Sequence, residues 1–400
     1  MKLKVIFAVL TLTVLLSMLI NVGLAEDRNQ IVILNASNNS RMKTAITMFR
    51  EKYPHMEVVL KETSDSRTIG TWMMSKTGEV DIVATIELYL PMTTYQYYSA
   101  GAIDDLSQYP VIMQHMEAYR ADQFGALMID DAFLAVPEYL NPTAWKVNDE
   151  LASEMNISIP QGEWTWSDFA EIGRQIKAYN EVHGTKYYLL LDNPYAPYIL
   201  KQLNANAADI VAGSSNYSSA TYCEGMTAWV EMVQEGLIAD RRKNATAVAL
   251  FLFDTMLDYG SLRQEHYIIP PAFDSETKYP LSVNALMINA NSCHKEEAAY
   301  FLSCYFAPEN VAAAGLEDVG PWLKDDSQQV SVVTDPSKAV SVANKDLWLT
   351  LLRRGTMDMG IGEIKREQWN VLYPQLIEGE ITVEQFLNSC QHRVNLMLGE

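Results

Sequence analysis

The chain has 400 residues, a formal net charge of −20 and four cysteines. So acidic a surface repels the phosphates of nucleic acids and anionic lipids, which argues against nucleic acid as a partner. One hydrophobic core rarely serves more than ~250–300 residues, so this length predicts two lobes.

Residues 1–25 have the composition of a secretory signal peptide. Lys2 and Lys4 precede an apolar run at residues 5–20, and small residues at 23 and 25 suit a cleavage site. An uncleaved membrane anchor is the alternative, although the run is short for a span of ~20 residues. No cysteine lies near the expected cut, so a lipid anchor is not indicated. We expect a periplasmic or extracellular protein, whose net charge after cleavage would be −22.

Strands and helices alternate in the first part of the expected mature chain. Residues 31–34 are a continuous apolar run, typical of a strand buried on both faces of a parallel sheet, and residues 80–84 predict another strand of the parallel type. Between them, Ala45 and Phe49 recur at helical spacing, and residues 55–60 predict a second strand. This order indicates an α/β protein.

The segment at residues 132–177 lies at the centre of the predicted organisation. Residues 132–136 predict a short strand that Pro137 ends, because proline cannot donate to a ladder. A helix is expected at 148–155, and another begins near residue 166, where Thr165 or Ser167 can cap it. Further strands are expected at 187–191, 248–253, 266–269 and 281–288, and further helices at 198–204, 224–235, 295–306, 344–353, 366–377 and 383–398.

The four cysteines leave two alternatives open. Cys293 and Cys304 flank the helix expected at 295–306, which holds them more than ~10 Å apart, too far for a disulfide. A Cys223–Cys390 bond remains as one alternative, and buried free thiols as the other.

The order of these segments resembles the family 1 extracellular solute-binding proteins, which serve ABC importers and include the maltodextrin- and sugar-binding class. The resemblance covers most of residues 31–398 and rests on Pro137 and Tyr139, on Trp166-Ser167-Asp168-Phe169, and on the helix pattern from Asn291 to Leu302. It implies a two-lobed periplasmic-binding-protein fold of class II type, in which crossover segments join two mainly parallel sheets flanked by helices. The implied division is a signal peptide at 1–25, a first lobe at 26–137 plus 284–318, and a second lobe at 138–283 plus 319–400.

Candidate ligand-binding residues follow the strands, because open α/β sheets bind ligands beyond the carboxyl ends of their strands. The chain has 8 Trp and 21 Tyr, whose rings can stack on sugar C–H faces, while carboxylates and amides can bind the hydroxyls. The candidates are Ser37, Asn38, Thr85, Glu87, Tyr89, Tyr139, Asn141, Tyr195, Phe253, Asp254 and Trp322.

No motif of a nucleotide site, a zinc protease or a serine hydrolase appears in the sequence, and the six histidines are scattered. We therefore predict no catalytic residue, no metal and no cofactor. We expect a monomer that captures a small solute, with a sugar favoured, and delivers it to the membrane permease of an ABC importer by hinge closure. A ligand-sensing partner of a membrane receptor or sensor kinase is the alternative, and a secreted hydrolase is a third.

Overall fold

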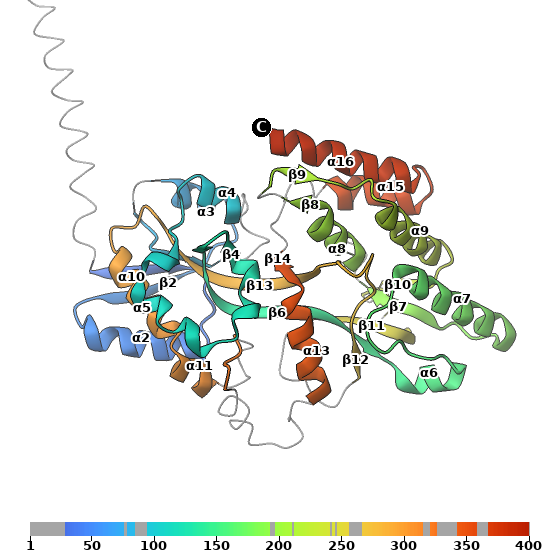
Figure 1. Ribbon diagram of the computed structural model, residues 1–400, viewed down its shortest axis with the longest axis horizontal. Helices are drawn as coiled ribbons and strands as arrows, with labels where there is room; N and C mark the ends of the chain where they lie inside the picture. Colours follow the sequence, from blue (N-terminus) through green and yellow to red (C-terminus); the bar gives the residue numbers. More distant parts are fainter. Residues whose placement is uncertain are drawn as a thin grey trace, which may run out of the picture.

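The computed structural model describes residues 29–75, 78–84, 94–192, 197–209, 212–240, 242–244, 246–255, 266–314, 321–325, 342–357 and 367–399. The predicted signal peptide lies outside these residues. Within them, a ten-stranded sheet runs in the order β10-β7-β11-β6-β13-β3-β1-β2, with β12 paired to β6 and β14 paired to β13. Helices flank the two ends of this sheet, and two long strands run between them (Figure 1).

The first half of the fold is built on β1 (Gln30–Leu34), β2 (Glu57–Lys61) and β3 (Ile82–Ala84). β1 pairs in parallel with both β2 and β3, so the predicted parallel sheet is present. All four residues 31–34 are fully buried, as their continuous apolar run predicts. The flanking helices are α2 (Ser40–Lys52), α3 (Ser66–Met74) and α10 (Lys295–Tyr305).

The second half is built on β7 (Tyr188–Asp192), β10 (Ile238–Asp240), β11 (Ala249–Thr255) and β12 (Tyr267–Ile268). β7 lies parallel to β10 and to β11. The flanking helices are α6 (Asp149–Met155), α7 (Trp166–His183), α8 (Tyr198–Ala207) and α9 (Ala220–Gln234). Thr165, one of the two residues predicted to cap this helix, forms a complete capping box at the start of α7.

Two antiparallel strands cross between the halves, β6 (Val136–Val147) and β13 (Tyr279–Ile288). Residues 136–142 of β6 pair with β13, and residues 143–147 pair with β11. Residues 286–288 of β13 pair with β3 of the first half. β6 therefore pairs with strands of both halves.

The prediction that a strand ends at Pro137 is wrong, because β6 runs through both Pro137 and Pro142. Ala285 pairs with Pro137 and Asn284 pairs with Tyr139, so the register between the two strands skips Glu138. This irregularity is a β-bulge, one of the few places where a sheet accepts a proline.

An aromatic core holds the second half together. Trp145 of β6 is fully buried and packs edge-on against Trp164 and Trp166, with ring centroids 5.8 and 5.9 Å away. Trp166 contacts Trp229 of α9 in the same manner at 5.7 Å. These tryptophans therefore pack at the start of α7 and do not line an open surface.

The remaining elements complete the two halves. They are α4 (Thr94–Ser99), α5 (Pro110–Met113), β4 (Met128–Ile129), β5 (Ala132–Phe133), β8 (Ala208–Asp209), β9 (Ser214–Ser215), α11 (Pro308–Ala314), α13 (Val342–Arg353), β14 (Gly355–Met357), a π-helix (Gln368–Leu372), α15 (Tyr373–Ile377) and α16 (Val383–Gly399), with short 3-10 turns at Leu106–Gln108, Met116–Ala118, Ala121–Gln123 and Gly125–Leu127.

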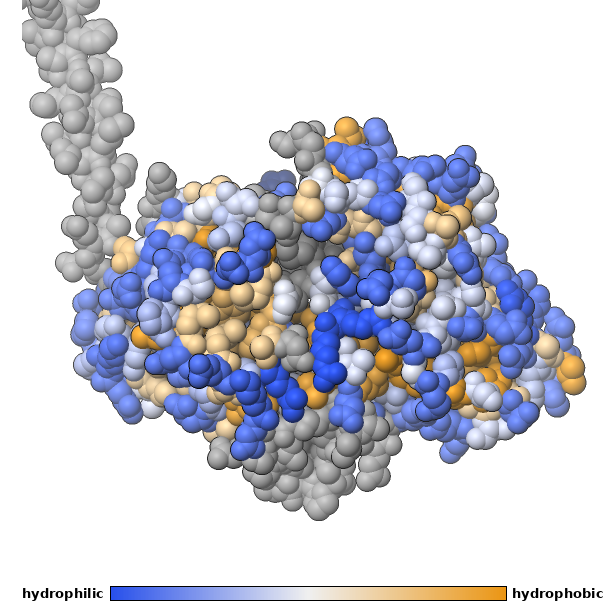
Figure 2. All heavy atoms as spheres, viewed as in Figure 1, coloured by the Kyte–Doolittle hydropathy of each residue, from blue (hydrophilic) through white to orange (hydrophobic). Residues whose placement is uncertain are grey.

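The surface is consistent with the acidic, polar composition. Figure 2 shows mostly hydrophilic residues on the visible face, with hydrophobic side chains gathered in separate patches on both halves. None of the helices in the described ranges has the length and hydropathy needed to span a bilayer.

None of the four cysteines forms a disulfide, so the Cys223–Cys390 bond does not form. Cys304 and Cys390 are buried, Cys223 is half-buried and Cys293 is exposed. The alternative of free thiols is confirmed, although only two of the four are buried.

Candidate functional site

The crossing strands carry polar side chains on one face, where a buried sheet usually carries apolar ones. Asn284 stands opposite Tyr139 and Ser282 opposite Asn141, and residues opposed on antiparallel strands share a face. Asn141 is 1 % exposed, and Glu138 and Asn284 are each 2 % exposed. We name this polar face, with the adjoining Ser37, the crossover site.

Glu138 is the charged group at the centre of the crossover site. Its Oε1 accepts a hydrogen bond of 2.9 Å from the backbone N–H of Ser37, and the Tyr305 hydroxyl lies 3.5 Å away. Its Oε2 accepts a hydrogen bond from the side-chain amide of Asn284. These donors replace the water that a carboxylate loses on burial, a loss that is costly when uncompensated.

Arg41 of α2 holds the bulge from the first half. Its side chain is fully buried, and its guanidinium donates to the backbone carbonyls of Pro137 and Glu138. The guanidinium also lies 4.6 Å from the ring centroid of Tyr305. A buried cation therefore stabilises the backbone conformation that presents Glu138 and Tyr139.

Two amide oxygens in the crossover site accept no hydrogen bond from any residue that the structure describes. They are Oδ1 of Asn141 and Oδ1 of Asn284, and both are buried. An unpaired buried acceptor costs about 1–3 kcal/mol, so such groups are rare in native structures and call for an explanation. These oxygens can accept from an O–H or N–H donor that enters the site.

The polar face continues along β6 towards the second half. Alternation along a strand puts Tyr139, Asn141, Thr143 and Trp145 on the same face. Thr143 is 6 % exposed, and Trp145 is part of the aromatic core described above. The crossover site therefore extends from the end of β1 to the aromatic core of the second half.

No protein-family model matches this chain, and no curated protein sequence matches it. Solved structures do match its fold. An ABC substrate-binding protein from Listeria monocytogenes in complex with cycloalternan has a TM-score of 0.65 at 13 % identity, covering 92 % of this chain and 98 % of its own. A sugar transporter from Rhizobium etli in an open conformation has a TM-score of 0.66 at 16 % identity, covering 91 % and 98 %.

Maltose-bound MalE3 from T. maritima is similar at a TM-score of 0.62 and 14 % identity, covering 92 % of this chain and 99 % of its own. The chain has the two-lobed fold of substrate-binding proteins. This agreement over nine-tenths of the length confirms the predicted fold class. In the substrate-binding-protein fold, the two halves described above are the two lobes.

The structure brings three of the predicted residues together in the crossover site. They are Ser37, which is half-buried, with Tyr139 and Asn141 on β6. Asn38 is exposed beside Ser37. Thr85, Glu87, Tyr89 and Tyr195 lie outside the described residues.

Phe253 and Asp254 were expected after the last strand of the second lobe, and this placement is wrong. β11 continues to Thr255, so both residues lie within the strand, paired with Trp145 and Ala144 of β6. The local apolar pattern ends at Phe253, but pairing with β6 extends the strand beyond it. Both residues therefore adjoin the second-lobe end of the crossover site.

Trp322 is 1 % exposed and is packed inside the protein. Its backbone N–H and C=O bind the side-chain amide of Gln123 at 2.7 and 2.8 Å, and its ring centroid lies 6.2 Å from that of Trp348 in α13. A role of Trp322 in ligand binding stays a prediction.

Sequence patterns missed Arg41, Glu138 and Asn284, which contribute most of the charge and hydrogen bonding at the crossover site. One signal was present: Arg41 lies four residues before Ala45 and eight before Phe49, on the apolar face of α2. A charged residue on such a face needs a buried partner. Asn284 had no comparable signal, because its partner lies 146 residues away.

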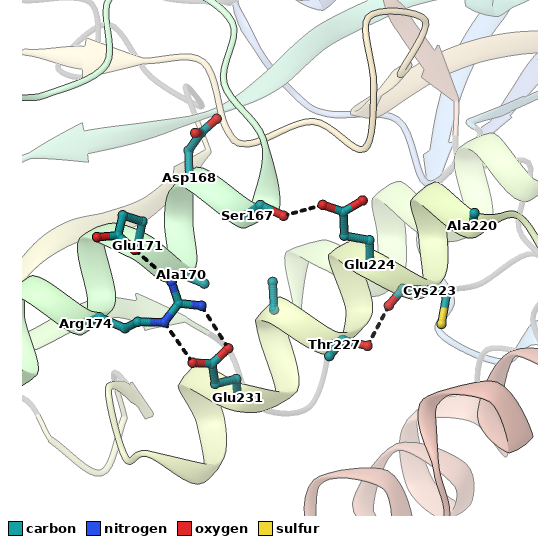
Figure 3. A pocket seen from close by; sticks show the side chains of 11 residues that line it. Ser167, Asp168, Ala170, Glu171, Arg174, Ala220, Cys223, Glu224, Thr227 and Glu231 are labelled. Atoms are coloured by element: carbon teal, nitrogen blue, oxygen red, sulfur yellow. Dashed lines mark hydrogen bonds and ion pairs between the residues drawn. The ribbon is translucent and has the colours of Figure 1, made fainter.

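A concave surface lies between α7 and α9, away from the crossing strands (Figure 3). This groove has a volume of about 650 Å³. Arg174 binds Glu171 at 2.8 Å and Glu231 at 3.1 Å, and the Ser167 hydroxyl donates to Glu224 at 2.8 Å. These polar groups satisfy one another, whereas two acceptors of the crossover site have no donor within the described part of the chain.

Proposed function

We propose that this protein captures a small solute, a sugar or oligosaccharide, at the crossover site between its lobes. The observation that carries the proposal is the pair of buried amide oxygens of Asn141 and Asn284, on the strands that cross between the lobes, which accept no hydrogen bond from the described residues. The similar structures support the ligand class, because their descriptions name cycloalternan, maltose and xylan utilization.

The chemistry of the crossover site favours a neutral ligand rich in hydroxyl groups. Amide oxygens accept hydrogen bonds from hydroxyls, and the ring of Tyr139 offers a flat apolar face to sugar C–H groups. Glu138 and the net charge of −20 oppose a phosphorylated ligand. The described residues contain no cluster of metal-ligating side chains and no activated nucleophile, so we assign a binding role rather than catalysis.

The proposed mechanism is closure of the two lobes around the solute. Contacts that form only when both lobes engage the ligand shift the population towards the closed form. The closed form then delivers the solute to the membrane permease of an ABC importer. We further propose a secreted monomer with a signal peptide at 1–25, a first lobe at 26–137 plus 284–318, and a second lobe at 138–283 plus 319–400.

The test is a thermal-shift screen of the mature chain against maltose, cycloalternan and xylo-oligosaccharides. A true ligand raises the melting temperature by mass action, by an amount that grows with its concentration. The proposal of a sugar ligand fails if every carbohydrate leaves the melting temperature unchanged while a peptide or polyamine raises it.

A matched pair of variants locates the site once a ligand is found. Asn141→Ala removes one acceptor and should weaken binding about two- to tenfold, since one hydrogen bond contributes about 0.5–1.5 kcal/mol. Asn388→Ala, at an exposed position of α16, should leave the affinity unchanged. Equal affinities for the two variants would exclude Asn141 from the site.

A further inference from the structure

Strand β6 is held at two places by different lobes. Its start is held at the bulge, where Arg41 of the first lobe donates to the carbonyls of Pro137 and Glu138. Its end is held by the second lobe, because residues 143–147 pair with β11. Any change in the angle between the lobes must therefore bend β6 between these two places.

The anchor at the bulge is fixed firmly within the first lobe. The side chain of Asn310 donates to the backbone carbonyl of Arg41 at 3.0 Å and to that of Cys304 at 3.1 Å. These bonds tie the start of α2 to α10 and α11. The carboxylate of Glu138 adds a further tie, because it accepts from the backbone of Ser37 in the loop after β1.

Separating the bulge from Arg41 would be costly. The guanidinium is fully buried, so losing the two carbonyl acceptors would leave a buried cation short of partners. Hydrogen bonds from a charged donor are also roughly twice as strong as neutral ones. Bending at residues 137–138 is therefore opposed more strongly than bending further along the strand.

The segment between the two anchors has no comparable hydrogen bonds to a buried charged side chain among the described residues. It consists of residues 140–142, opposite residues 281–283 of β13. Pro142 has no N–H to donate to a neighbouring strand. The Asn141 side chain is buried, yet its amide oxygen accepts no hydrogen bond from the described part of the chain.

We propose that Arg41 is a positioning residue that confines the bending between the lobes to residues 140–142 of β6 and 281–283 of β13. The inference rests on the lobe closure of the proposed function. It goes further by assigning the fixed side of the hinge to one buried arginine. The hinge then lies at the crossover site itself, so a ligand bound to Asn141 would contact the segment that bends.

The two prolines of β6 allow a direct test, because one lies at the anchor and the other in the proposed hinge. Glycine relaxes the backbone at either position, since it populates conformations closed to proline. Spin labels at Arg50→Cys in α2 and Glu181→Cys in α7 report the distance between the lobes, both sites being exposed. Cys223→Ser and Cys293→Ser remove the two accessible native thiols.

In the ligand-free protein, Pro142→Gly should broaden the distance distribution by roughly 1.5-fold or more, as expected for a strand freed at its bending point. Pro137→Gly should leave the width unchanged, because Arg41 still holds the bulge. Combined with Arg41→Met, Pro137→Gly should broaden the distribution as well. Arg41→Lys, which keeps the charge and one donating group, should give an intermediate width in the same background.

Broadening by Pro137→Gly in the presence of Arg41 would overturn the inference, and so would an unchanged width in Pro142→Gly. If Pro142→Gly does not fold, the comparison of Pro137→Gly with and without Arg41→Met still tests the anchor at the bulge. Because these measurements need no ligand, they remain decisive even if the thermal-shift screen rejects a sugar. Failure of the proposed function and failure of the hinge assignment are therefore separate results.

Discussion

Replacing Glu138 by leucine should destabilise the protein far more than replacing it by glutamine. The carboxylate accepts hydrogen bonds from the backbone of Ser37 and from the side chains of Tyr305 and Asn284. Leucine removes this acceptor from two fully buried donors, Tyr305 and Asn284, at about 1–3 kcal/mol each. We therefore expect Glu138→Leu to lower the free energy of unfolding by about 2–6 kcal/mol.

Glutamine should be tolerated because Asn284 can adapt to it. The Oδ1 atom of Asn284 accepts no hydrogen bond among the described residues. If the Asn284 amide rotates by half a turn, this oxygen accepts from the new NH₂ group while the glutamine oxygen still faces Ser37. We expect Glu138→Gln to cost less than about 1 kcal/mol.

Urea unfolding followed by tryptophan fluorescence measures these differences as shifts of the midpoint at a constant slope. The control is the double variant Glu138→Leu with Asn284→Leu, which removes the orphaned amide and should recover about 1–3 kcal/mol. The reasoning is refuted if glutamine costs as much as leucine, or if the double variant is no more stable than Glu138→Leu alone.

Gly225→Ala should cost about 1–3 kcal/mol, since an added Cβ would lie 2.6 Å from the ring of Phe273; chemical denaturation checks this. Burial raises the pKa of Cys304 to about 11 and that of Cys390 to about 12. Both thiols should resist a thiol reagent until the protein unfolds, and stability should fall as the pH rises from 9 towards these values, because the unfolded state loses the protons first. Arg174→Ala should change stability by less than about 1 kcal/mol, because Arg174 is 51 % exposed, and the difference should shrink at high salt.

Each of these predictions has an internal comparison. Gly125→Ala should be nearly neutral, because an added Cβ there meets nothing within 4 Å. Cys293 is exposed and should react with the reagent in the folded protein. Rapid labelling of Cys304 or Cys390 under native conditions would contradict the burial of these thiols, and a large, salt-independent loss in Arg174→Ala would contradict the exposed ion pairs.

Much of the secondary structure could be predicted because its causes are local. Residues 31–34 form a strand buried on both faces, and a continuous apolar run is the direct signature of such a strand. The start of α7 follows from Thr165 and Asp168, which satisfy the first N–H groups of the helix within one turn. Such signals depend only on neighbours in the chain, so they can be interpreted without the tertiary structure.

Pro137 shows where local evidence misleads. Proline usually ends a strand because it cannot donate to the ladder. Here β6 continues because the bulge between Ala285 and Asn284 removes the need for that hydrogen bond, and because Arg41 donates to the buried carbonyls of Pro137 and Glu138. Ala285 and Arg41 are both far from Pro137 along the chain, so no local window contains the information.

The amino-acid sequence by itself determined the alternation of strands and helices, the mainly parallel sheet and the need for two lobes, since burial periodicity and length act along the chain. Only the tertiary structure decided which polar groups meet. Arg41, Glu138 and Asn284 come from three distant segments, and the register of β6 and β13 together with the packing of α2 brings them within hydrogen-bonding distance. A shift of one residue would turn each side chain to the opposite face, so the composition of the crossover site depends on pairing that no local pattern specifies.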